Sequence, residues 1–256
     1  MLSPLSIPPE LIPFVYGLTF VIGLCFGSFL NVVAHRFLTE QSIVFPASNC
    51  PACNTPLSWK ENIPIIAYIL QGGKCRHCQA EIGIEYPLAE LFTGILFVGV
   101  IWLSGISLQS LILLFIVSNL VVVTITDFKE SLIFNVNSLY LVPVGLVYAF
   151  LDLGKTSQTV YELGIIPIPE SFVSAVTGVF LAYLVFEGMI ILSKWILNEE
   201  GFGHGDTYLM MFAGSFLGWQ LMLIAILLGF IFQAIPAIPM LAWQYYKNKQ
   251  YSVFSL

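Results

Sequence analysis

The chain has 256 residues, of which 58% are hydrophobic and only 9% are charged, and its formal net charge is −6. Soluble domains carry about 25% charged residues, so the composition excludes an ordinary water-soluble protein. The negative charge argues against nucleic acid as a partner, because phosphate binding needs a basic surface. A mean hydropathy of +0.90 indicates an integral membrane protein, with the lipid bilayer as its main surroundings.

The apolar stretches predict the topology. In chain order they are 11–33, 87–104, 108–126, 132–151, 171–197, 207–218 and 220–245. A helix needs about 20 apolar residues to cross a bilayer, so we expect an all-α polytopic membrane protein with about seven transmembrane helices. The run 207–218 is short and carries two glycines, which predicts a tilted or half-length helix.

A long polar segment interrupts this pattern once, between the first and second apolar runs. We therefore expect a first transmembrane helix at 11–33, a loop domain at 34–86 and a membrane domain at 87–246. With the N-terminus outside, eight of the nine Lys and Arg residues lie inside, and only Lys155 lies outside. Because basic residues collect on the cytoplasmic side, the loop domain is predicted to be cytoplasmic.

The loop domain contains two C-x-x-C pairs, Cys50-Pro-Ala-Cys53 and Cys75-Arg-His-Cys78, separated by 21 residues. Each pair presents two thiolates on one side of a tight turn, and two pairs complete a tetrahedral Cys₄ zinc site. Such a closed site has no open position, which predicts structural zinc in a zinc-ribbon-like module. The alternatives are a redox dithiol or a site without metal, and His77 is a further ligand or a solvated loop residue.

Two aspartates fall at the predicted cytoplasmic boundary of the membrane. Asp127 ends the run 108–126, and Asp206 closes the string Gly203-His204-Gly205-Asp206 before the run 207–218. Two carboxylates held together share one proton, so one can deprotonate water while the other polarises the scissile carbonyl. The pattern predicts the catalytic pair of an aspartic protease. The alternative for Asp206 is a helix N-cap.

These features lie within a longer series of motifs, and with it the chain resembles the type IV prepilin peptidase family, also called prepilin leader peptidases/N-methyltransferases. The resemblance covers about residues 23–220. In chain order the series is Gly27-Ser28-Phe29-Leu30-Asn31-Val32-Val33-Ala34-His35-Arg36, the two cysteine pairs with Glu61-Asn62-Ile63-Pro64-Ile65 between them, Glu85-Tyr86-Pro87-Leu88-Ala89-Glu90, the Asp127 motif and the Gly203–Asp206 motif.

The resemblance implies a function. Family members remove the short basic leader of prepilins and pseudopilins, the subunits of type IV pili and type II secretion systems, at the cytoplasmic face of the bacterial inner membrane. Asp127 and Asp206 inherit the cleavage, and the four cysteines inherit metal binding. Many members then methylate the new N-terminus from S-adenosylmethionine, whose binding residues stay unassigned here.

Two other classes of function compete. Presenilin-like and archaeal preflagellin-type peptidases share the G-x-G-D pattern, but the four-cysteine module is not expected in them. A transporter or a membrane assembly factor would carry charges in mid-membrane, along a path. The paired acids of this chain sit at one face instead.

The chain departs from the family pattern at two positions. Phe134 stands in Ile133-Phe134-Asn135 where proline is usual, and Tyr208 stands where lysine is usual. The lost cation could alter the balance of pKa between the aspartates, and the departures bear on whether methyl transfer is retained.

Several other polar residues keep two interpretations. Asn31 is predicted to make an interhelical hydrogen bond. Glu90 is a helix-start acid or part of the methyl-transfer site, and Glu187 lines a groove or pairs within the bundle. Glu199 and Glu200 are solvated or hold the basic leader.

Overall fold

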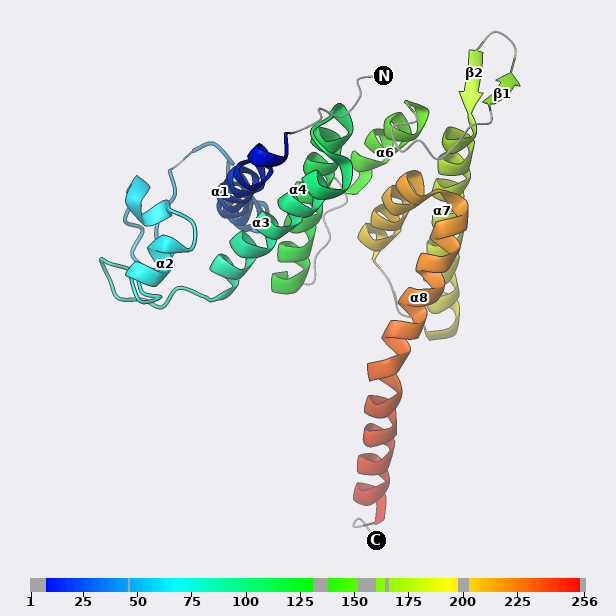
Figure 1. Cartoon of the computed structure of the whole chain (residues 1–256). Helices are drawn as coiled ribbons and strands as arrows, with labels where there is room; N and C mark the ends of the chain where they lie inside the picture. Colours follow the sequence, from blue (N-terminus) through cyan, green and yellow to red (C-terminus); the bar gives the residue numbers. More distant parts are fainter. Residues whose placement is uncertain are drawn as a thin grey trace. The chain divides into compact units, whose positions relative to one another are not determined.

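The computed structural model in Figure 1 describes residues 8–45, 47–130, 138–151, 160–163, 166–197 and 203–253. Its elements are η1 (Pro9–Leu11), α1 (Ile12–Leu38), η2 (Trp59–Asn62), α2 (Ile66–Leu70), α3 (Glu85–Ser104), α4 (Leu108–Glu130), α6 (Leu141–Phe150), β1 (Val160–Leu163), β2 (Ile166–Pro169), α7 (Glu170–Leu197) and α8 (His204–Val253). Apart from the short antiparallel hairpin of β1 and β2, the regular secondary structure of the described residues is helical, and the chain between α1 and α3 consists mainly of turns and loops. The predicted all-α class is confirmed.

Five of these helices are long and apolar enough to cross a membrane. They span Pro9–Leu38, Glu85–Ser104, Leu108–Glu130, Glu170–Ile196 and His204–Phe232. The run expected at 132–151 contains α6, an apolar helix of ten residues, while residues 131–137 lie outside the described part. The chain is a multi-pass membrane protein.

Gly218 divides α8 where the sequence predicts a boundary between two apolar runs. Its φ of 72° and ψ of 173° are not helical, and this region of backbone conformation is open essentially only to glycine. A Cβ at this position would also overlap the Ser174 hydroxyl of α7. The segment after the Gly203–Asp206 motif is therefore a short helix followed by a longer one, because the glycine permits both a break and a close approach.

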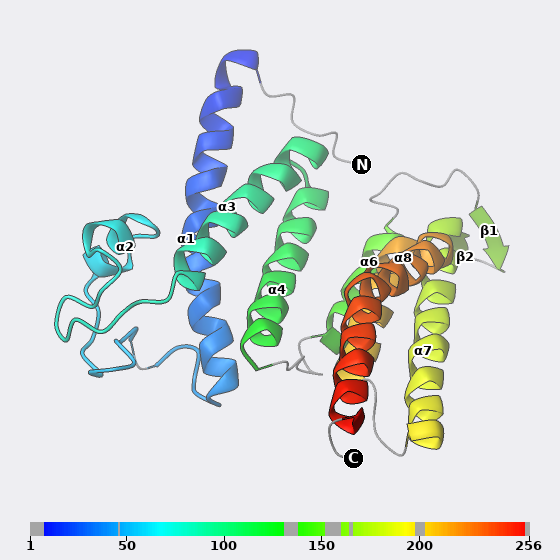
Figure 2. The ribbon, with the colours of Figure 1, turned by 90° about the horizontal axis from the view of Figure 1, so that it is seen from below.

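The chain divides into two compact units, residues 1–141 and 142–256. In the first unit α1, α3 and α4 pack against one another in antiparallel succession (Figure 2). Its core joins α1 to α4 through Leu30, Val33, Ala34, Val121 and Val122. The C-terminal ends of α1 and α4 consequently lie at the same end of this unit (Figure 2).

Glycines allow α1 and α3 to approach closely. A Cβ on Gly23 would lie 2.7 Å from the Cα atom of Gly94, and one on Gly27 would lie 2.7 Å from the Cα atom of Glu90. Gly23 and Gly27 are four residues apart, so they share one face of the helix. Small residues at this spacing drive packing in membranes, where lipid removes the hydrophobic advantage of larger side chains.

In the second unit, glycine again allows two helices to approach closely. The helices α7 and α8 pack against each other, with Ala182, Phe186 and Met222 in their core. A Cβ on Gly178 would overlap the backbone carbonyl of Gly214. Each unit therefore holds a helix pair whose separation is set by glycine.

Replacing Gly23 with leucine is expected to destabilise the protein by about 1–3 kcal/mol, because a side chain would be forced into backbone. Gly17→Leu on the same helix is the matched control, since nothing lies within 4 Å of a Cβ there. Thermal unfolding of the purified proteins in detergent measures both, with a drop in Tm on the order of 5 °C for Gly23→Leu. Equal melting temperatures for the two variants would show that the α1–α3 contact does not depend on glycine.

Candidate functional site

The two cysteine pairs adopt the same local backbone structure. In the first, the Cys50 N–H donates to the Thr55 carbonyl (3.0 Å) and the Asn54 N–H donates to the Cys50 carbonyl (2.8 Å). In the second, the corresponding bonds join Cys75 to Ala80 (2.8 Å) and Gln79 to Cys75 (2.9 Å). Asn54 and Gln79 both have positive φ, 55° and 61°, so the chain turns sharply after each pair.

The two turns bring all four sulfur atoms together. The Sγ atoms of Cys50, Cys53, Cys75 and Cys78 all lie within 4.8 Å of one another. The Sγ atoms of Cys50 and Cys78, from different pairs, are 3.9 Å apart. A tetrahedral zinc with Zn–S bonds of about 2.3 Å separates its sulfurs by about 3.8 Å. The predicted ligand set is thus assembled as a group that could hold a metal ion.

The local hydrogen bonds favour thiolates at two positions. Hydrogen bonds with the side chain and backbone of Thr55 lower the pKa of Cys53 to about 6. The backbone N–H groups of Cys78 and His77 lower the pKa of Cys75. The backbone of Ala80 acts in the same direction on Cys78, but desolvation and the neighbouring cysteines outweigh it and raise the pKa of Cys78 to about 11. Neighbouring thiolates repel one another, and a bound cation would offset that repulsion. The arrangement therefore fits a metal-binding cluster.

Two polar residues of α1 bind the chain just before and just after the cysteine module, residues 48–82. The Asn31 amide donates to the Tyr86 carbonyl in the first turn of α3 (3.2 Å), which confirms the predicted interhelical bond. The Arg36 guanidinium donates to the carbonyls of Ser42 and Ile43 at 2.8 Å each. Arg36 is buried, so it fixes the chain where α1 passes into the loop.

Asp127 lies in the last turn of α4, and its side chain is exposed. Two residues later, the Lys129 Nζ lies 3.4 Å from the Tyr86 hydroxyl and 4.6 Å from the centre of its ring. Tyr86 lies in the first turn of α3, and its carbonyl accepts from Asn31 of α1. The C-terminal end of α4 therefore lies beside the point where the chain passes from the cysteine module into α3. Asp127 and the module therefore share one end of the first unit.

Asp206 lies in the first turn of α8, in the second unit, and is partly exposed. The Gly203 N–H donates to Asp206 Oδ2 (3.1 Å), and the Asp206 N–H donates to the Gly203 carbonyl (3.1 Å). The carboxylate thus reaches back to the residue before the helix, as a third-position acid does in a capping box. Asp206 takes part in helix capping, although from inside the helix rather than from the predicted N-cap position.

Of the remaining residues singled out in the sequence, some lie within the described part of the chain and some lie outside it. Glu187 of α7 lies 3.6 Å from His204 Nδ1 at the start of α8, so it pairs within the bundle, one of its two interpretations. Tyr208 is half-buried in the first turns of α8. Phe134, Glu199 and Glu200 lie outside the described residues.

The sequence prediction missed a role for Glu61. Its carboxylate Oε2 accepts from the Ser58 N–H (2.9 Å) and hydroxyl (2.6 Å), forming a capping box for η2. The pattern Ser58-x-x-Glu61 is the signal that could have shown this contact.

Comparisons with known proteins match two regions of the chain, one with the four cysteines and one with the two aspartates. The model of the bacterial peptidase A24 N-terminal domain matches residues 21–104, which include the four cysteines. The model of the type IV leader peptidase family matches residues 113–238, which include Asp127 and Asp206. No solved structure matches the chain significantly.

Three similar proteins are each named prepilin leader peptidase/N-methyltransferase. The protein from Klebsiella pneumoniae is 34% identical, over 86% of this chain and 94% of its own length. The Pseudomonas aeruginosa protein is 31% identical, over 87% and 80%. The Myxococcus xanthus protein is 33% identical over 92% of this chain, which spans 66% of its length. Both parts of the chain thus match the same group of enzymes, and the chain belongs to the type IV leader peptidase family.

Proposed function

We propose that this chain is a bifunctional membrane enzyme that removes the basic leader of prepilins or pseudopilins and then N-methylates the new N-terminus. The observation that carries the proposal is the match of both parts of the chain to named prepilin leader peptidases/N-methyltransferases. The module with four clustered cysteines favours this function over other G-x-G-D proteases and over a transporter or assembly factor.

Peptide cleavage is assigned to Asp127 and Asp206. One carboxylate, ionised, deprotonates the attacking water, and the other, protonated, donates to the scissile carbonyl. Both side chains are accessible at helix ends, where a peptide can reach them. The capping bond from Gly203 orients the Asp206 carboxylate and leaves the acid one further oxygen for water or substrate.

Zinc is the proposed occupant of the cysteine cluster. Four sulfur donors at tetrahedral spacing suit zinc, and a closed set of four leaves no coordination position for a substrate. Zinc would be held by Cys50, Cys53, Cys75 and Cys78 and would fix the module. The proposed domains are a first transmembrane helix at 11–33, a cytoplasmic metal-binding loop at 34–86 and a transmembrane peptidase domain at 87–246.

The site is proposed to face the cytoplasm of a bacterial inner membrane. In the first unit, Arg36, Lys129 and the cysteine module lie at the same end as Asp127. Basic residues at this end support a cytoplasmic orientation. A substrate whose apolar helix lies in the bilayer, with a basic leader ahead of it, would present its scissile bond at this boundary.

Mass spectrometry of a prepilin incubated with the protein and S-adenosylmethionine tests both activities together. We expect loss of the leader and a gain of one methyl group on the new N-terminus. Cleavage without methylation would contradict the proposed methyl transfer, and a prepilin left intact would contradict both proposed activities.

A further inference from the structure

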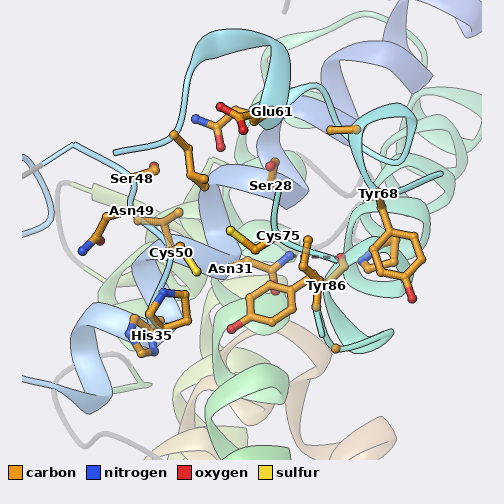
Figure 3. A pocket seen from close by; sticks show the side chains of 18 of the residues that line it. Ser28, Asn31, His35, Ser48, Asn49, Cys50, Glu61, Tyr68, Cys75 and Tyr86 are labelled. Atoms are coloured by element: carbon orange, nitrogen blue, oxygen red, sulfur yellow. Dashed lines mark hydrogen bonds between the residues drawn. The ribbon is translucent and has the colours of Figure 1, made fainter. Parts of the chain in front are cut away.

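A large pocket lies between the cysteine module and the membrane helices of the first unit. Its volume is about 720 Å³, within the roughly 300–1,000 Å³ of small-molecule sites. Its walls come from α1, the module and the start of α3, through residues such as Ser28, Asn31, Glu61, Cys75 and Tyr86 (Figure 3). The pocket lies entirely within one compact unit of the chain.

Glu61 gives this pocket an unused hydrogen-bond acceptor. Only 7% of its side chain is exposed. Its Oε2 is bound by Ser58, whereas its Oε1 is buried and accepts no hydrogen bond. The His77 Nε2 lies 3.5 Å from Oε1, beyond ordinary hydrogen-bond distance, and it is a cation only when the imidazole is protonated. A buried acceptor without a donor is costly, which points to a ligand that supplies one.

The charge of the lining selects a cation. Four glutamates line the pocket, at positions 61, 81, 85 and 90, together with one arginine and one histidine. The arginine, Arg36, already donates to two backbone carbonyls. Hydrogen bonds from Ser58 lower the pKa of Glu61, so this carboxylate is ionised at neutral pH. The excess of carboxylates therefore attracts a positively charged molecule.

A strained turn forms one wall. Ile65 has a φ of 59° and a ψ of −49°, which is rare for a β-branched residue. The Ile66 N–H donates to the Pro64 carbonyl, closing a three-residue γ-turn around Ile65. Glu90 of α3 accepts from the Ile65 N–H at 2.7 Å and holds the turn in place. Strain of this kind persists where the surrounding structure enforces it, and it concentrates at binding sites.

We propose that this pocket binds S-adenosylmethionine, with Glu61 Oε1 accepting a hydrogen bond from the amino group or ribose hydroxyls of this sulfonium methyl donor. The proposal rests on the proposed methyl transfer and assigns it a site. The carboxylates that line the pocket offset the sulfonium charge. Glu90 acts as a positioning residue, because it reaches the wall of the pocket through Ile65.

The transfer balances without another reactant. The nitrogen of the new pilin N-terminus, as a neutral amine, forms a bond to the methyl carbon. The carbon–sulfur bond breaks, and its electron pair stays on sulfur, which becomes a neutral thioether. The methylated amine then loses a proton to solvent.

Equilibrium dialysis of S-adenosylmethionine against the purified full-length protein tests the site without any turnover. Glu61→Gln is expected to raise the Kd about tenfold or more, since an amide can retain the Ser58 contacts but places an N–H where the acceptor was. Val32→Phe, which fills the pocket from α1, should raise the Kd similarly. Glu40→Gln is the matched control, because Glu40 is exposed and does not line the pocket.

Metal content and melting temperature are measured for every variant, and Val32→Phe carries the test if Glu61→Gln loses the fold of the module. A wild-type Kd in both pocket variants would overturn the proposal, as would a change confined to the KM for the pilin amine. A wild-type protein that neither binds the donor nor methylates a cleaved pilin would instead contradict the proposed methyl transfer itself.

Discussion

Asp127→Asn and Asp206→Asn are each expected to reduce the rate of leader cleavage by about 10³-fold or more. General acid–base catalysis contributes about 10²–10⁴-fold, and in an aspartic pair each residue performs a different proton transfer. Asparagine preserves the size of the side chain but can neither take a proton from water nor donate one as an acid. Either substitution therefore removes a function that the remaining aspartate cannot replace.

The measurement is the initial rate of leader removal from a purified prepilin in detergent or lipid, followed by mass. Asp152→Asn is the matched control, since Asp152 is the one other aspartate in the sequence and belongs to no motif. For Asp206→Asn the melting temperature is measured as well, because the carboxylate also accepts from the Gly203 N–H. If a stable variant cleaves at a rate near that of the wild type, the substituted aspartate is not a member of the catalytic pair.

Cys75→Ser is expected to remove the bound zinc and unfold the cysteine module. The wild-type protein should carry about one zinc per chain, and the variant should carry almost none. Structural zinc contributes on the order of 10 kcal/mol or more to the folding of small zinc modules. Cys75 is only 4% exposed and sits within the cluster, so a hydroxyl cannot replace its thiolate.

Elemental analysis after purification without chelators measures the zinc, and limited proteolysis reports whether residues 48–82 have opened. Cys25→Ser is the control, because Cys25 is exposed on α1 and lies outside the cluster. Zinc retained in Cys75→Ser at the wild-type level would contradict the proposed ligand set. A wild-type protein without metal would favour a redox-active dithiol.

Local patterns of the sequence were enough to predict the apolar helices in outline and the cysteine cluster. About seven membrane-spanning helices were expected, and the described residues contain five that are long and apolar enough to cross a membrane. A transmembrane helix satisfies its own backbone hydrogen bonds, so a run of apolar residues nearly defines it. The break at Gly218 also falls at the predicted boundary between two apolar runs. A C-x-x-C pair folds within a few residues, so the assembly of Cys50, Cys53, Cys75 and Cys78 could be predicted before any tertiary contact was known.

Contacts between segments distant in the chain could be predicted only in part. Asn31 was expected to bond another helix, but its partner, the Tyr86 carbonyl, is 55 positions away. Glu90 kept two interpretations because its partner, the Ile65 N–H, lies 25 positions earlier in a strained turn that no propensity favours. In the sequence Glu61 appeared only as part of a motif, and the burial of its Oε1 could be recognised only in the folded structure.

The membrane class, the order of the helices, the two cysteine pairs and the two candidate aspartates could all be predicted from the chain alone, because each depends on residues close together in the chain. The folded arrangement was needed to show which faces of the helices meet, that Gly23 and Gly27 allow α3 to approach α1, and which polar residues line the pocket beside the module. The physical reason is that local patterns fix backbone conformation. Packing between distant segments, by contrast, depends on the combined shape of side chains that no local pattern records.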